Sequence, residues 1–122
     1  MRCPIRSPNL GVVAASPLRG EVWRVQLDPT RGSEIRKTRP CVVITTDVLN
    51  ARRRSVVIVP LSTSPQAAPP LLIGVRCTGT PSVAVLDQIR AVDKDRLKEK
   101  LAVLTQAELE LIEGGLREVL EL

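Results

Sequence analysis

The chain has 122 residues, with 18 Lys and Arg against 13 Asp and Glu, which gives a net charge of +5. It contains no His, Tyr or Phe and a single Trp. This composition excludes a histidine-pair nuclease, a histidine-ligated metal site and base stacking on several aromatic side chains. Residues 19–54 carry nine basic and four acidic side chains, so this part of the chain is expected to face a polyanion.

The cysteines and the first residues of the chain indicate its setting. Cys3, Cys41 and Cys77 are widely spaced and suggest neither a disulfide framework nor a zinc site. We interpret Cys41 and Cys77 as small buried residues of a cytoplasmic protein. Residues 1–18 are interpreted as a partly disordered extension, and residues 19–122 as one domain. Neither a signal peptide nor a membrane-spanning segment is predicted.

Two strands with a charged loop between them come first in the predicted domain. Glu21–Leu27 alternates apolar and polar residues, as a half-buried strand does. After the loop Arg31–Pro40, the apolar run Cys41–Thr46 is typical of a central strand. Arg39 precedes a proline, and this position favours extended backbone. We therefore expect Arg39 to lie at the start of the second strand.

Further short strands are predicted in the middle of the chain. Asp47 is expected to cap a helical turn, and Val56–Val59 favours another buried strand. Leu71–Cys77 and Ser82–Leu86 are two more predicted strands, and Asp87–Ala91 is interpreted as an extension of the second.

The end of the chain is predicted to be helical. A helical turn is expected at Asp93–Leu97, and a capping box of Thr105 and Glu108 opens an amphipathic final helix. Gly114 and Gly115 inside this helix should each cost about 1 kcal/mol relative to Ala, which indicates close approach of another backbone. The whole pattern predicts a mainly β, α+β fold: a small β-barrel with helical appendages.

A resemblance to a known family rests on three stretches in this order: RGEVWRVQLDPTRGSEIRKTRPCVVIT, VVIVPLSTS and VAVLDQIRAVDKDRL. Together they resemble the MazF/PemK family of toxin endoribonucleases over about residues 18–122. The resemblance implies an SH3-like barrel, a homodimer and sequence-selective cleavage of single-stranded RNA without metal or other cofactor. It also implies a type II toxin–antitoxin pair, in which a MazE-like antitoxin covers the RNA groove with an acidic, apolar tail.

The resemblance also implies which residues act. The family's catalytic arginine precedes a proline, which corresponds to Arg39 here. Ser62 corresponds to the catalytic hydroxyl, usually Thr in the family, and the adjacent Thr63 is the alternative. Glu34 of the Gly-Ser-Glu motif is the candidate base, with a salt bridge to neighbouring cations as its other interpretation. The residues themselves, apart from the resemblance, predict RNA contacts at Arg31, Ser33, Arg36, Lys37, Arg52, Arg53 and Gln88. For Arg52–Arg54 a solvated turn is the alternative interpretation. No metal ligand is expected.

These residue types suit RNA cleavage without a metal ion. The 2′-hydroxyl attacks the adjacent phosphorus and leaves a 2′,3′-cyclic phosphate and a 5′-hydroxyl. Arg39 can stabilise charge on the phosphate oxygens, Ser62 can donate to one of them, and Glu34 can accept the 2′-hydroxyl proton. One alternative is a non-enzymatic gyrase poison on the same barrel, which the non-aromatic end Val119–Leu122 disfavours. Another is a catalytically silent RNA- or antitoxin-binding module, which Ile35–Lys37, in place of the family's Gln-x-Gly, leaves open.

Overall fold

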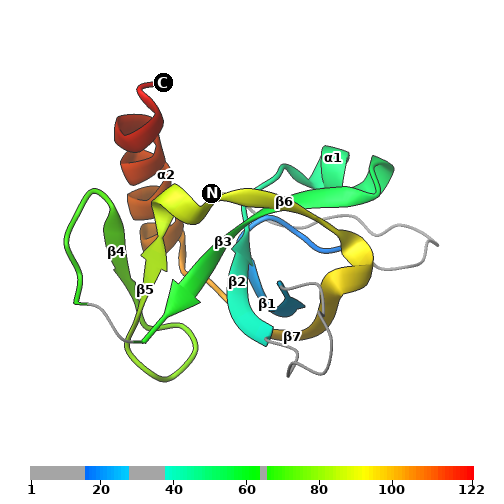
Figure 1. Cartoon of the computed structure of the whole chain (residues 1–122), viewed down its shortest axis with the longest axis horizontal. Helices are drawn as coiled ribbons and strands as arrows, with labels where there is room; N and C mark the ends of the chain where they lie inside the picture. Colours follow the sequence, from blue (N-terminus) through cyan, green and yellow to red (C-terminus); the bar gives the residue numbers. More distant parts are fainter. Residues whose placement is uncertain (1–15, 28–37, 64–65) are drawn as a thin grey trace, which may run out of the picture.

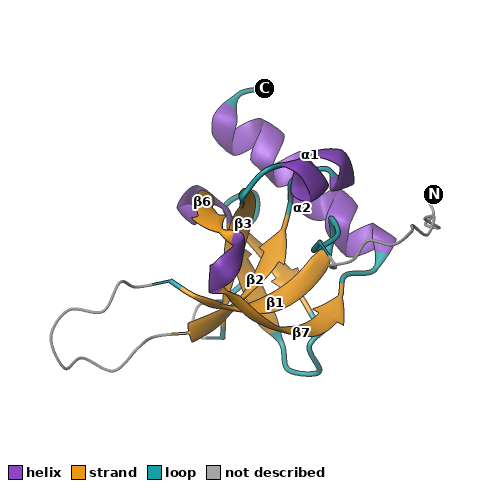
Figure 2. Ribbon diagram, turned by 90° about the vertical axis from the view of Figure 1, so that its right-hand side faces the viewer, coloured by secondary structure: helices purple, strands orange, loops and turns teal. Residues whose placement is uncertain are grey.

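Seven antiparallel strands form one curved sheet, against which a long C-terminal helix packs (Figures 1 and 2). The structure is a computed structural model that describes residues 16–27, 38–63 and 66–122. Its elements in chain order are β1 (Glu21–Gln26), β2 (Thr38–Val43), α1 (Asp47–Arg52), β3 (Ser55–Ser62), β4 (Leu72–Val75), β5 (Ser82–Val85), the 3-10 turn η1 (Leu86–Gln88), β6 (Arg90–Asp93), the 3-10 turn η2 (Lys94–Arg96), β7 (Leu97–Val103) and α2 (Gln106–Leu120).

Five of the strands form a partly open barrel, as the sequence predicted. The sheet order is β4-β5-β3-β2-β1-β7, and β6 pairs with the first half of β3. The turn η2 joins β6 directly to β7, which pairs with β1 at the other edge. The strands β6, β3, β2, β1 and β7 therefore surround a common interior, while β4 and β5 extend beyond it beside α2 (Figure 1).

The central strands β2 and β3 are buried on both faces, as their apolar runs predicted. Successive side chains of a strand point to opposite faces, so each strand contributes to two cores. The inner core lies within the barrel and contains Val25, Leu27, Cys41, Val43, Val56, Ile58 and Val92. The outer core lies under α2 and the β4–β5 hairpin and includes Val22, Val42, Val59, Leu61, Ile73, Val75, Leu86, Ile112 and Leu116.

Helix α2 begins with the predicted capping box, and the expected close approach of another backbone is found at one of its two glycines. The Thr105 hydroxyl accepts from the Glu108 amide, and the Glu108 carboxylate accepts from the Thr105 amide. A Cβ on Gly115 would lie 2.7 Å from the Pro70 carbonyl oxygen, so another backbone does approach there. A Cβ on Gly114 would meet nothing within 4 Å, so the expected close approach is wrong for that residue.

Two local predictions are corrected by the structure. Thr46, and not Asp47, caps α1, because its hydroxyl accepts from the Leu49 amide. The Asp47 carboxylate instead accepts from the Arg19 amide at 2.7 Å. Residues 87–91 do not extend β5: the chain turns through η1, because the buried Leu86 packs beneath α2, and a separate strand follows.

The other differences concern strand ends and one missed strand. Strand β2 begins at Thr38 and ends at Val43, earlier than predicted, and β4 ends at Val75. The sequence reasoning missed β7 entirely, whereas the predicted turn before it is present as η2. Of the predicted extension over residues 1–18, residues 1–15 lie outside the described part of the chain.

Candidate active site

Arg39 is the second residue of β2, directly before Pro40. Its backbone pairs with Val25 of β1, so the extended conformation expected from the following proline is confirmed. The side chain is exposed. Strand β2 therefore presents the Arg39 guanidinium to solvent at the edge of the barrel. The pairing of β2 with β1 fixes the backbone position from which this side chain extends.

Ser62 is the last residue of β3, and the strand register brings it towards Arg39. Strands β2 and β3 pair from Val43 opposite Ile58 to Cys41 opposite Pro60, where the ladder ends. Arg39 and Ser62 each lie two residues beyond that last pair, on neighbouring strands. Thr63 follows the end of the strand and is exposed.

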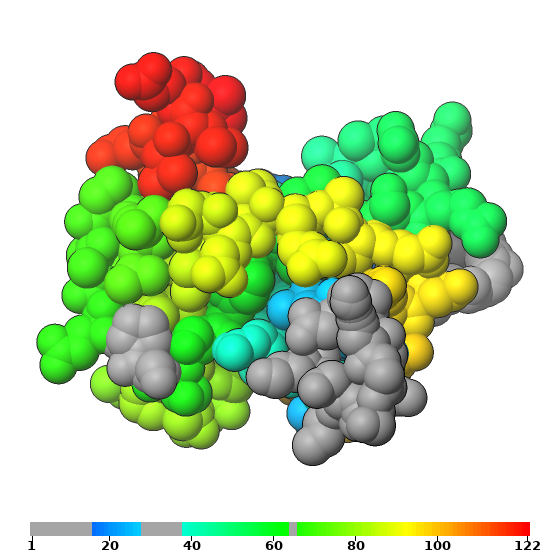
Figure 3. Space-filling view, viewed as in Figure 1, coloured from blue at the N-terminus to red at the C-terminus, as the bar shows by residue number. Residues whose placement is uncertain are grey.

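A cavity of about 380 Å³ joins these residues, and we call it the catalytic pocket. It lies where the start of β2 (cyan in Figure 3) adjoins the end of β3 (green). Its lining consists of Thr38, Arg39, Pro40, Leu61, Ser62, Thr63 and Ser82. The predicted arginine and both candidate hydroxyls are therefore brought together.

Ser82 is a lining residue that the sequence reasoning missed. It is the first residue of β5, largely buried, and its hydroxyl donates to the Thr80 carbonyl at 3.1 Å. No sequence signal identifies it, because it reaches the pocket only through the pairing of β5 with the end of β3.

Cys41, two residues after Arg39, is buried in the inner core, as predicted. Burial raises the pKa of its thiol to about 12, although the nearby positive charges of Arg39 and Arg90 oppose that rise. The thiol lies 3.6 Å from the Arg39 carbonyl oxygen, to which it donates. Because nucleophilic cysteines require an accessible thiolate, Cys41 is a packing residue and takes no part in bond cleavage.

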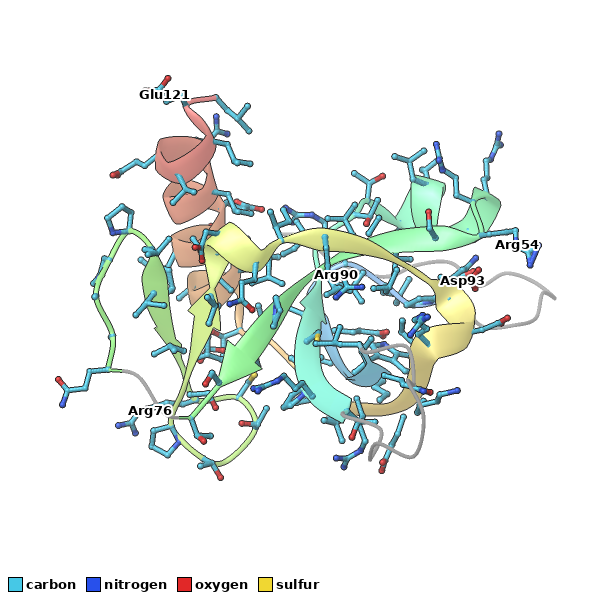
Figure 4. The ribbon with its side chains drawn as sticks, viewed as in Figure 1. Arg54, Arg76, Arg90, Asp93 and Glu121 are labelled. Atoms are coloured by element: carbon cyan, nitrogen blue, oxygen red, sulfur yellow. The ribbon has the colours of Figure 1, made fainter. Side chains whose placement is uncertain are left out.

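Two arginines from the other side of the barrel hold the end of β1 beside Arg39. Arg96 donates to the Gln26 carbonyl at 3.0 Å, and Arg90 donates to the Leu27 carbonyl at 3.5 Å. Figure 4 shows Arg90 on β6 above the barrel interior. Sequence reasoning assigned neither residue this role, because both contacts join positions far apart in the chain.

Of the other predicted site residues, some lie outside the described part of the chain and the rest lie away from the catalytic pocket. Glu34, Arg31, Ser33, Arg36 and Lys37 lie outside the described residues. Arg52 and Arg53 lie at the end of α1, just before β3 begins, so the full length of β3 separates them from Ser62. Gln88 is exposed in η1 and does not line the pocket. Their expected RNA contacts stay predictions.

The described part of the chain contains no group of three or more His, Cys, Asp and Glu side chains that could hold a metal ion. Within the same residues, no helix has the length and apolar character needed to span a membrane.

Comparison with known proteins identifies the family. The family described as "PemK-like, MazF-like toxin of type II toxin-antitoxin system" matches residues 18–120. This chain belongs to the PemK/MazF toxin family. The relatives include the endoribonuclease MazF9 of Mycobacterium tuberculosis, which is 33% identical over 85% of this chain and 96% of its own. The endoribonuclease MazF of Staphylococcus epidermidis is 32% identical over 80% of this chain and 86% of its own.

Solved PemK/MazF structures share the fold. A mycobacterial endoribonuclease in complex with its cognate antitoxin superimposes with a TM-score of 0.71 and 27% identity, covering 89% of this chain and 97% of its own. A MazE–MazF complex from Deinococcus radiodurans gives a TM-score of 0.79 at 22% identity, covering 89% and 99%. These likenesses confirm the mainly β barrel with a C-terminal helix, and the relatives named above favour an endoribonuclease over a gyrase poison or a silent binding module.

Proposed function

We propose that this chain is the endoribonuclease of a type II toxin–antitoxin pair and cleaves single-stranded RNA at short sequences without a metal ion. The observation that carries the proposal is the pairing of a strand-borne arginine with a hydroxyl in one cavity, Arg39 with Ser62. The products are a fragment with a 2′,3′-cyclic phosphate and a downstream fragment with a 5′-hydroxyl.

Arg39 acts on the phosphate. When the 2′-hydroxyl attacks the phosphorus, negative charge builds up on the non-bridging oxygens. A guanidinium offers paired donors to two such oxygens and stays protonated at neutral pH. Because β2 fixes the backbone of Arg39 before substrate arrives, little reorganisation is needed as the charge develops, which is the main source of such stabilisation.

Ser62 and Glu34 complete the proposed chemistry. Ser62 lines the same cavity as Arg39 and donates a hydrogen bond to the same phosphate group. A serine hydroxyl is a poor base, so the proton of the attacking 2′-hydroxyl goes to the Glu34 carboxylate. The leaving 5′-oxygen takes a proton from water.

The test is to incubate the purified protein with a long RNA in excess EDTA and analyse the new ends. We expect cleavage at short recurring sequences to persist, with every downstream fragment accepting a phosphate from a 5′ kinase without prior dephosphorylation. Cleavage that requires added magnesium, or downstream fragments with 5′-phosphates, would contradict this mechanism. Intact RNA under all conditions would contradict the proposed function itself.

The choice between the two hydroxyls gives a further prediction. We expect Ser62→Ala to lower kcat about 10-fold or more, since a donor to the developing charge is lost. Thr63→Ala should change kcat less than about 3-fold, because Thr63 lies beyond the end of β3, where no strand fixes its backbone. Single-turnover cleavage of one RNA measures both variants, with Ser62→Thr as the control that retains the hydroxyl. The reverse order of effects would make Thr63 the functional hydroxyl.

The partners follow from the same surface. We propose that the protein works in the cytoplasm as a homodimer, and that a MazE-like antitoxin with an acidic, apolar tail covers the catalytic pocket. Such a tail would compete with RNA for the positive charge of Arg39 and for the basic residues of the loop before it. We expect a dimer by light scattering at micromolar protein and loss of RNA binding when the antitoxin tail is added. A monomer, or simultaneous binding of tail and RNA, would contradict these assignments.

A further inference from the structure

A second cavity adjoins the catalytic pocket. It has a volume of about 540 Å³, which lies in the range of small-molecule sites. We call it the flanking pocket. Its lining includes Thr63, Gly74, Arg76, Ser82 and Glu108. Thr63 and Ser82 line both cavities. An RNA strand whose phosphate lies beside Arg39 can therefore place a neighbouring nucleotide in the flanking pocket.

The Glu108 carboxylate is held in a fixed orientation at this pocket. One of its oxygens accepts from the Thr105 amide at 3.0 Å, and the other accepts from the Arg76 amide at 2.8 Å. A carboxylate has about four acceptor positions, so each oxygen retains a position for another donor. Because the backbone holds both oxygens, Glu108 forms a rigid pair of acceptors, and a ligand need not order it on binding.

Arg76 brings the opposite charge to the same pocket. It directly follows β4, and its exposed side chain is labelled at the end of this strand in Figure 4. The amide of Arg76 is used to hold Glu108, whereas its guanidinium carries five donors in a planar fork. The flanking pocket is therefore lined both by a residue with two fixed acceptor oxygens, Glu108, and by a residue with a planar set of donors, Arg76.

Gly74 leaves the space for a planar ligand. A Cβ built on it would meet only Ala67, at 3.8 Å. This position in β4 therefore accepts a side chain without backbone strain, and a larger side chain would take up room in the flanking pocket that glycine leaves empty.

We propose that the flanking pocket binds the nucleobase next to the scissile phosphate and selects guanine. This inference rests on the proposed function. A carboxylate disfavours a second phosphate but accepts from N–H groups of a base. Guanine has two such donors, N1–H and the N2 amino group, and its O6 and N7 acceptors are the usual partners of an arginine fork. Glu108 and Arg76 match these two edges, and no other base combines them.

The experiment maps cleaved ends in a randomised RNA pool in EDTA. It compares the wild type, Arg76→Ala and Gly74→Val, with Gly114→Ala as a matched glycine control in open space on α2. We expect the wild type and Gly114→Ala to prefer guanine at one position beside the cut. Arg76→Ala and Gly74→Val should reduce that preference about 10-fold or more, because discrimination of this size follows from a bidentate base contact. Preferences at other positions should not change.

A second arm tests Glu108 without changing the protein. RNA with inosine in place of guanine at the preferred position lacks the N2 amino group, and the wild type should cleave it about 5-fold or more slowly. Equal rates for inosine and guanine would overturn the role of Glu108. A preference that Arg76→Ala leaves unchanged would overturn the pocket itself while the proposed function stands.

Three further results of these experiments would also confirm or contradict guanine selection by the flanking pocket. If Gly74→Val loses all activity, Arg76→Ala decides alone, since its exposed side chain can be truncated without loss of packing. If the variants weaken only the binding of an acidic antitoxin peptide, the pocket belongs to the protein partner and the inference is wrong. A wild-type protein that cleaves no RNA would contradict the proposed function, and this inference with it.

Discussion

Replacing Arg39 with alanine is expected to lower kcat for RNA cleavage about 100-fold or more, since the main donor to the transition-state charge is lost. RNA affinity should fall much less, because other basic residues share the phosphate contacts. Arg39→Lys should recover only part of the loss, because an ammonium replaces the paired donors of the guanidinium. Single-turnover cleavage and RNA titration, measured separately, give the two quantities.

The control for this substitution is Arg117→Ala, which removes an exposed arginine from α2. It makes the same change of net charge far from the catalytic pocket in the chain and should leave kcat unchanged. An Arg39→Ala protein that cleaves at nearly the wild-type rate would place the chemistry elsewhere. A loss of affinity as large as the loss in kcat would make Arg39 a binding residue and not a stabiliser of the transition state.

The same substitution at two adjacent glycines of α2 is expected to have opposite effects on stability. A Cβ on Gly115 would lie 2.5 Å from Leu86 Cδ1 and 2.7 Å from the Pro70 carbonyl oxygen. The carbonyl is backbone and cannot turn aside, so Gly115→Ala should lower the free energy of unfolding by about 1–3 kcal/mol. Gly114→Ala meets open space and should raise it by up to about 1 kcal/mol, because alanine favours helix.

Urea unfolding followed by circular dichroism measures both glycine variants on the same helix. Their difference cancels the common change in helix propensity and isolates the contact of α2 with the chain around Pro70 and Leu86. Equal stabilities would mean that α2 can move away from these residues without cost, and that the close approach at Gly115 does not hold the helix in place.

The sequence predicts well those helices and strands that form because of local residue patterns and not because of pairing with distant segments. Val56–Val59 is apolar and β-branched throughout, so a strand buried on both faces was the natural interpretation. The capping box of Thr105 and Glu108 is a local hydrogen-bond pair and was found for the same reason. Strand β7 was missed because Lys98, Glu99 and Lys100 are poor strand formers, and it exists through pairing with β1.

The candidate site was predictable where a motif lies within a strand. The family resemblance assigned Arg39 from the proline after it, and Ser62 from the Pro-Leu pair before it at the end of a strand. Ser82 and the fixed carboxylate of Glu108 depend on pairings between distant segments, which no local pattern shows. Arg52 and Arg53 were grouped with the site by charge alone, although an eight-residue strand separates them from Ser62.

The hydrogen bonds from Arg90 and Arg96 to the end of β1 also bear on synthesis of the protein. The donors and acceptors are separated by 63 and 70 residues, and β1 further requires β7 as its outer neighbour. A ribosome adds residues in order, so the strand beside Arg39 has neither its clamps nor its edge partner until most of the chain has emerged. The strand beside Arg39 is therefore held in place only once Arg96 and β7 are available, which is late in synthesis of the chain.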